Sequence, residues 1–203
     1  MKITLSDNLS YCTGVQRTLS LVEELIAENP GKLYYMLGEI VHNEHVINRM
    51  KSLGLRIIYG LDEIDDPGIV IIQSHGAPGR IFDQLKTKNI DYIDATCPMV
   101  SLIHRRIHKL EKDGYFPVII GRKGHDEVSG IAGQVRDALI FGSPEEVTEE
   151  ALAGNDRVGI VVQSTYIRAE TLAIVDRIKA VVPEVKFIDT ICRPTTERQT
   201  EIS

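Results

Sequence analysis

Tryptophan is absent from this chain of 203 residues, so no binding site can be built on a tryptophan platform. Long apolar runs are absent too, because no segment approaches the roughly 20 apolar residues needed to cross a bilayer. The apolar start of the chain is too short for a secretory signal, which predicts a cytoplasmic protein. Positive charge is also in short supply, since the net charge is −6. That balance disfavours general nucleic-acid binding, although a local basic patch could still hold phosphate.

Cysteine is scarce as well, with only Cys12, Cys97 and Cys192. An odd number cannot pair completely within the chain, and a reducing cytoplasm disfavours disulfides. The three thiols are therefore free cysteines, metal ligands or catalytic groups. Two nucleotide-binding motifs are missing, the GxGxxG turn after a strand and the GxxxxGK[ST] loop. Neither a nicotinamide site nor an NTP site has motif support.

Short apolar segments alternate with longer amphipathic segments along the chain. The apolar segments predict buried strands at 2–5, 33–36, 55–59, 69–72, 118–120, 157–162 and 186–188. The amphipathic segments predict helices at 14–28, 45–53, 81–88, 101–112 and 168–181. Strands that alternate with helices are typical of an α/β fold with mainly parallel sheets.

Several landmarks recur at a similar spacing. The tetrapeptide at 94–97 (DATC) resembles that at 189–192 (DTIC), and 71–75 (IIQSH) resembles 161–165 (VVQST). We infer a duplicated α/β unit, each copy opened by a cysteine, with chance similarity between short β-rich segments as the alternative. The repeat predicts lobes at 1–97 and 98–192 and the start of a truncated third lobe at 193–203. Three such units around one axis would form a trefoil, and in this chain the third lobe is expected to be missing.

Each cysteine stands just before a helical segment, and Pro98 suits the first position of a helix. A thiolate there is stabilised by free backbone N–H groups and the positive end of the helix dipole. Repeated lobes around one axis would bring three thiolates together. Three thiolates on a four-iron cluster leave one iron open for a substrate oxygen. The alternatives are a Cys₃His zinc site, with His42 or His125 as fourth ligand, and three unrelated buried thiols.

Three histidines, His42, His75 and His125, each follow a predicted strand. Ligand sites of α/β proteins form at the carboxyl ends of strands, where imidazoles can bind a diphosphate or pass protons. The structural alternative is a surface or capping role for each histidine.

An acidic side chain, Glu127, follows His125 by two residues. Two hydroxyl side chains, Ser164 and Thr165, lie in the second copy of the repeated segment. Glu127 is a candidate proton donor, and Ser164 and Thr165 could relay that proton through a hydroxyl. The structural alternative is that Glu127 favours the start of a helix and that the two hydroxyl residues form a helix cap.

At these residues the chain resembles the 4-hydroxy-3-methylbut-2-enyl diphosphate reductase family. The resemblance rests on seven motifs in order: CTGV at 12–15, EIVHN at 39–43, SHG at 74–76, DATCP at 94–98, GRKGHDEVSG at 121–130, QST at 163–165, and DTIC at 189–192 with Arg198 and Gln199. Each motif alone is weak, whereas seven in order at compatible spacing are specific.

The resemblance implies three α/β units around a [4Fe–4S] cluster held by Cys12, Cys97 and Cys192. It implies removal of the substrate hydroxyl as water, giving isopentenyl and dimethylallyl diphosphates, with electrons from a ferredoxin or flavodoxin. The implied site residues are His42, His75 and His125 for the diphosphate, Glu127 as proton source, and Ser164 with Thr165 beside the substrate. Ser164 replaces the usual threonine of the family and keeps its hydroxyl.

Two departures from the family pattern are visible. Asp126 stands where the family usually has proline, and the Ser-x-Asn element of the family's third unit is not in these 203 residues. A truncated chain, an inactive fragment, a non-catalytic metal-binding paralogue and an apo interaction domain are therefore alternatives to the active reductase.

Overall fold

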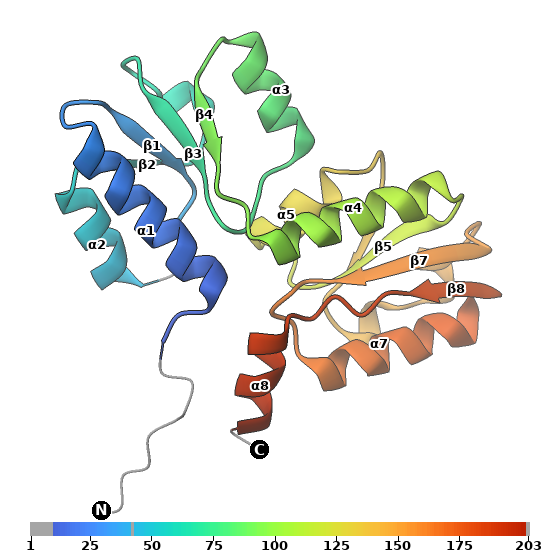
Figure 1. Ribbon diagram of the computed structural model, residues 1–203. Helices are drawn as coiled ribbons and strands as arrows, with labels where there is room; N and C mark the ends of the chain where they lie inside the picture. The colour runs from blue at the N-terminus through green and yellow to red at the C-terminus, as the bar shows by residue number, and fades with distance from the viewer. Residues whose placement is uncertain (1–9, 42, 202–203) are drawn as a thin grey trace, which may run out of the picture. The chain divides into compact units, whose positions relative to one another are not determined.

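The computed structural model of the protein describes residues 10–41 and 43–201. Internal contacts divide the chain into two compact units (Figure 1). The N-terminal unit comprises residues 11–100, and the C-terminal unit comprises residues 101–201 together with Ser10. The boundary lies in the first turn of helix α4 (Pro98–Lys112). In the part of the chain described, no helix is both long and apolar enough to cross a bilayer.

The N-terminal unit is a four-stranded parallel sheet with helices on both faces. In chain order it contains α1 (Thr13–Glu28), β1 (Tyr34–Leu37), α2 (Glu44–Ser52), β2 (Leu55–Ile58), the 3₁₀ turn η1 (Leu61–Glu63), β3 (Ile69–Ile72), α3 (Gly79–Thr87) and β4 (Tyr92–Asp94). The strand order is β2-β1-β3-β4, with every neighbouring pair parallel. The connections diverge between β1 and β3, and such a switch point opens a crevice at the carboxyl ends of the strands.

The C-terminal unit repeats this architecture. It contains α4, β5 (Phe116–Ile120), α5 (Asp126–Ala132), β6 (Leu139–Phe141), the 3₁₀ turn η2 (Pro144–Glu146), α6 (Glu149–Leu152), β7 (Arg157–Val162), α7 (Arg168–Val181), β8 (Glu184–Phe187) and α8 (Arg193–Glu201). The order β6-β5-β7-β8 is again fully parallel. Its switch point lies between β5 and β7, the counterparts of β1 and β3. The predicted fold class, repeated α/β units with parallel sheets, is confirmed.

Apolar side chains fill both faces of each sheet, as central parallel strands require. Along β3, Ile71 packs beneath α1 and α2, whereas Val70 and Ile72 face α3. Figure 1 shows these helices on opposite faces of the first sheet. Along β7, Val161 joins the core under α4 and α5, and its neighbours on the strand join the core under α7. Each sheet is therefore a rigid platform whose loops, not its strands, carry chemistry.

Differences from the expected elements follow from edge position and polarity. The strands β3 and β7 begin and end as predicted, and the ends of the other predicted strands in the described residues differ from the prediction by at most two residues. The strand expected at 2–5 lies outside the described residues. The short β4 and β6 were not predicted, because each is a three-residue edge strand without a long apolar run. Helix α8 follows Cys192, where a helix start was expected, although the expected helix had no predicted end because none of the residues of α8 is apolar.

Candidate functional site

All three cysteines stand immediately before a helix, as predicted. Cys12 is the N-cap residue of α1, Cys97 precedes α4, and Cys192 precedes α8. Each thiol is half-buried and forms no disulfide. The amino end of a helix, which is the positive end of its dipole, therefore lies beside each cysteine.

Cys12 and Cys97 meet within the N-terminal unit around Gly14. A Cβ atom at Gly14 would lie 2.8 Å from Sγ of Cys97 and 3.9 Å from Sγ of Cys12. Because both distances are measured from the same Cβ position, the distance between the two sulfurs cannot exceed the sum of these two distances. The buried Thr18 helps to hold this arrangement, since its hydroxyl lies 3.2 Å from the carbonyl oxygen of Gly14 and 3.4 Å from that of Ala95. Helix α1 is thereby tied to the loop that leads to Cys97.

The thiols of Cys12 and Cys97, which lie beside Gly14, are suited to bind a metal or cluster through their sulfurs. Glycine leaves the space that any other residue at position 14 would fill, and soft metals and iron–sulfur clusters take thiolate ligands. Within the described residues, no three His, Cys, Asp or Glu side chains are gathered as a complete metal site. Cys192 belongs to the C-terminal unit, so the meeting of all three sulfurs stays a prediction.

The loops before Cys97 and Cys192 use the same bonds in both units. The amide of Cys97 donates to the carbonyl of Ser74 at 3.0 Å, and the amide of Cys192 donates to the carbonyl of Ser164 at 2.9 Å. Before each cysteine an aspartate closes a turn, with Asp94 accepting from the amide of Thr96 and Asp189 from that of Ile191. The motif repeat seen in the sequence is thus a repeat of backbone geometry.

Among the described residues of the C-terminal unit, Glu127 on α5 has a buried carboxyl group, and this residue is 1% exposed. Its Oε1 accepts from the amide of Ser164 at 2.6 Å, and its Oε2 accepts from the Ser164 hydroxyl at 2.8 Å. Burial raises the pKa of Glu127, and the two bonds from Ser164 oppose this shift without overcoming it. A carboxyl that keeps its proton at higher pH, bonded to a hydroxyl, can deliver that proton through it.

His125 is the N-cap residue of α5. Its Nδ1 accepts from the amide of Glu127 at 3.1 Å, which leaves the imidazole proton of the neutral ring on Nε2. The capping role and a ligand role are therefore compatible, since they use different ring nitrogens. His75 lies in the other unit, where it is half-buried after β3 and its amide donates to Oε1 of Gln73 at 2.7 Å. His42 lies outside the described residues.

A cavity of about 560 Å³ opens at the carboxyl ends of β5, β6 and β7. Its lining includes two of the predicted site residues, His125 and Thr165. The other lining residues are Arg122, Lys123, Gly142, Glu146, Gln163, Tyr166, Ile167 and Glu170. The cavity therefore sits at the switch point of the second sheet, where α/β proteins bind ligands.

Residues without a predicted role shape this cavity. Gln163 accepts from the amide of Arg122 and donates to the Thr165 hydroxyl, both at 3.0 Å, so one amide group fixes two loops. Burial raises the pKa of Tyr166 to about 12, so its phenol remains a donor and bonds the carbonyl of Gly142. The sequence signal for Gln163 was its place in the repeated QS dipeptide, which marks position without showing contacts. Thr195 was also missed, and its hydroxyl lies 3.0 Å from Sγ of Cys192.

Comparison with known proteins places this geometry in context. The LytB protein family matches residues 3–203. A 4-hydroxy-3-methylbut-2-enyl diphosphate reductase of Aquifex aeolicus is 39% identical over 98% of this chain and 69% of its own length. The corresponding reductase of Aeromonas hydrophila is 33% identical, again over 98% of this chain, and 66% of its own length is covered. The chain thus spans about two thirds of the length of these relatives.

Solved structures give the same picture. A structure of (E)-4-hydroxy-3-methyl-but-2-enyl diphosphate reductase, the terminal enzyme of the non-mevalonate pathway, matches 98% of this chain and 71% of its own, with a TM-score of 0.83 and 38% identity. The E-1-hydroxy-2-methyl-but-2-enyl-4-diphosphate reductase from Plasmodium falciparum matches 94% of this chain and 61% of its own, with a TM-score of 0.84 and 29% identity.

Proposed function

The chain belongs to the LytB family, and from this membership we propose that it carries the reductive chemistry of the terminal step of the non-mevalonate pathway. The proposed substrate is 4-hydroxy-3-methylbut-2-enyl diphosphate. Its C–O bond breaks, the hydroxyl leaves as water, and a new C–H bond forms. Two electrons and two protons balance the step, and the products are isopentenyl and dimethylallyl diphosphates. The electrons come from a reduced ferredoxin or flavodoxin.

The proposed cofactor is a [4Fe–4S] cluster held by Cys12, Cys97 and Cys192. When bound, the cluster supplies one-electron transfer and an iron that can polarise an oxygen atom. The observation that carries the proposal is the meeting of two of these thiols around Gly14, far apart in the sequence and close in one unit. We also propose that residues 1–97 and 98–192 act as lobes around the cluster, and that 193–203 open a third.

The proton is assigned to Glu127 and passes through the hydroxyl of Ser164. The geometry supports this assignment because the Ser164 hydroxyl lies 2.8 Å from Oε2 of Glu127 and burial raises the pKa of the carboxyl. Ser164 is itself mostly covered, so the pair is shielded from bulk water. The relay therefore has a defined donor and a defined path.

The diphosphate is assigned to His42, His75 and His125, with Thr165 beside it. For His125 the support is its position, since it lines the cavity at the amino end of α5 and an imidazole can bind a phosphate oxygen. Thr165 lines the same cavity as His125, so hydroxyl and imidazole are available to one ligand.

Substrate-dependent oxidation of a reduced viologen dye by the anaerobically reconstituted chain tests this function. We expect turnover by the parent chain. We expect Glu127→Gln to lower kcat by about 10²- to 10⁴-fold while the iron content stays at the parental value, because amide and carboxyl have the same shape but the amide holds no transferable proton. Full activity in Glu127→Gln would refute the proton assignment, and a parent chain that holds iron but does not turn over would favour a non-catalytic paralogue.

A further inference from the structure

Helix α8 carries no apolar residue that could pack it onto the C-terminal unit. A helix of this kind is held by polar contacts or not at all. One of those contacts lies beside Cys192, whose amide donates to the carbonyl of Ser164. A second lies seven residues later at Gln199, which is two helical turns and therefore on the same side of α8.

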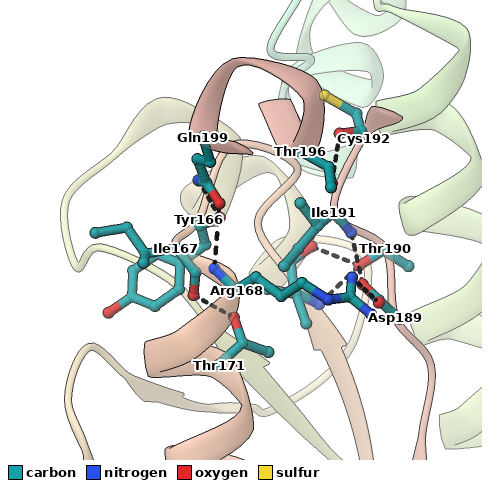
Figure 2. A network of polar contacts seen from close by, with 11 residues as sticks. Tyr166, Ile167, Arg168, Thr171, Asp189, Thr190, Ile191, Cys192, Thr196 and Gln199 are labelled. Carbon is teal, nitrogen blue, oxygen red and sulfur yellow. Dashed lines mark hydrogen bonds and ion pairs between the residues drawn. The ribbon is translucent and has the colours of Figure 1, made fainter. Parts of the chain in front are cut away.

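Gln199 uses both ends of its amide on the loop that follows β7. Its Nε2 donates to the carbonyl of Tyr166 at 3.1 Å, and its Oε1 lies 3.4 Å from the amide of Arg168, which donates to it. Figure 2 shows Gln199 reaching from α8 to this loop, with Cys192 just before the start of the same helix. The side chain therefore recognises a carbonyl and an N–H two residues apart in one segment.

The amino end of α7 needs such a partner. Its N-cap residue is Ile167, which has no side-chain oxygen and makes no capping bond. The first N–H groups of a helix lack partners within the helix, so an acceptor from elsewhere stabilises it. Gln199 gives this acceptor to Arg168 from a different element, and the side chain of Arg168 is in turn paired with Asp189 at 2.7 Å. Asp189 closes the turn that leads to Cys192.

From these contacts we infer that Gln199 is a positioning residue, which locks α8 against the Ser164 loop and so fixes the direction of the Cys192 thiol. Its importance for the reaction rests on the proposed function, whereas its effect on the thiol does not. The loop from 163 to 168 therefore accepts two hydrogen bonds from this segment. One comes from the amide of Cys192, just before α8, and the other from the side chain of Gln199, near the end of α8. The same loop carries the Ser164 hydroxyl, which is bonded to Glu127. The contacts of Gln199 therefore also fix the Cys192 thiol relative to the proposed proton donor.

The reaction rate of the Cys192 thiol with an aromatic disulfide reagent tests the inference. In the full chain carrying Cys12→Ser and Cys97→Ser, Cys192 is the only thiol. We expect Gln199→Ala to raise this rate about three- to tenfold, because a released α8 exposes the sulfur more often. We expect Gln199→Glu to raise it as well. The carboxylate keeps size and acceptor but cannot donate to the carbonyl of Tyr166, so a merely space-filling role predicts the parental rate in this variant.

Glu197→Ala is the matched control, because it alters the same helix and removes only an exposed ion pair with Arg193. We expect the parental rate in the control. Parental rates in both Gln199 variants, or an equal acceleration in the control, would overturn the inference. If the double serine chain does not fold, hydrogen exchange of the Arg168 amide in the native chain takes its place. We then expect several-fold faster exchange in Gln199→Ala than in Glu197→Ala, and equal exchange overturns the inference.

The two proposals can fail separately. A chain that takes up no iron but shows the Gln199 effect on Cys192 loses the proposed function and keeps the positioning role. A chain that takes up iron and turns over, yet shows no Gln199 effect, keeps the function and loses the positioning role.

Discussion

Gly14 matters because it has no side chain. Both thiols of the N-terminal unit lie within 4 Å of the place where a Cβ would stand. Adding that atom at 2.8 Å from Sγ of Cys97 forces this sulfur to rotate away from its place near Cys12. The pair of thiols therefore depends on a glycine at this position.

Gly14→Ala should weaken binding of an arsenical reagent that bridges two thiols by about tenfold, the equivalent of about 1.4 kcal/mol. Titration of the metal-free chain with phenylarsine oxide measures this affinity. Cys192→Ser is the control and should bind like the parent, because Cys12 and Cys97 remain. Unchanged binding in Gly14→Ala would show that the two thiols do not act as a pair.

Glu127 should make the stability of the fold depend on pH. Its pKa is raised in the folded state by burial, so the folded chain binds a proton more readily than the unfolded chain. The stabilising contribution is fully present below the unfolded pKa, which is about 4.3, and is lost as pH rises through the folded value. The carboxyl of Glu127 therefore contributes less to the stability of the fold at neutral pH than at pH 4.

Glu127→Gln should thus be more stable than the parent at pH 7, and the difference should shrink as pH falls toward 4. The amide can accept from the Ser164 amide and donate to the Ser164 hydroxyl, so it keeps both contacts. Urea unfolding at the two pH values measures the difference. A variant that is less stable than the parent at pH 7 would show that the buried carboxylate is favoured by its hydrogen bonds.

Among single residues, the sequence predicted those with distinctive chemistry. It paired Glu127 with the hydroxyl of Ser164 as a proton relay, and the two are in contact. It did not predict the roles of Gly14, Gln163 or Thr195, because these depend on distances between segments that no local pattern encodes. A motif marks where a residue stands in the chain, whereas its partners are set by the packing of the sheet.

Just after β8, a side-chain hydroxyl makes the hydrogen bonds to β7, whereas a backbone amide makes the corresponding bond in the N-terminal unit. In the N-terminal unit the amide of Ala95 donates to the carbonyl of Ile72. At the matching position of the second unit, the buried Thr190 hydroxyl accepts from the amide of Val162 at 2.8 Å and also bonds its carbonyl. The hydroxyl thus replaces a rung of the sheet directly before Cys192.

Thr190→Val should lower the free energy of unfolding by about 1–3 kcal/mol, because it keeps the shape and leaves buried backbone groups of β7 unpaired. Denaturant unfolding of the metal-free chain measures the change. Thr87→Val is the control, since Thr87 lies exposed near the end of α3 and should change stability by less than about 0.5 kcal/mol. Equal effects at the two positions would exclude the bridging role of Thr190.

Among elements, burial decided which ones could be predicted. Central strands such as β3 and β7 are continuous apolar runs, because both faces of the sheet are covered. The edge strands β4 and β6 have three residues each, which is too short to be recognised as a strand from an apolar run. Helix α8 is polar all round, so its position follows from tertiary contacts such as those of Gln199 and not from a periodic pattern.

At the scale of the whole molecule, two units share one strand order and one way of presenting a cysteine. Duplication explains why Cys97 and Cys192 each follow an aspartate turn and precede a helix. It also explains why candidate residues such as His75 and Thr165 are far apart in sequence, since each follows the corresponding strand, β3 or β7, of its own sheet. The account predicts that the thiols of both units serve a single cluster.

Iron and sulfide content after anaerobic reconstitution tests that claim most directly. The chain should take up about four irons and four sulfides, and Cys12→Ser, Cys97→Ser and Cys192→Ser should each lose them, because a [4Fe–4S] cluster with three protein ligands has none to spare. A colourless chain that binds zinc instead, or a cluster that survives Cys192→Ser with undiminished iron, would contradict the account.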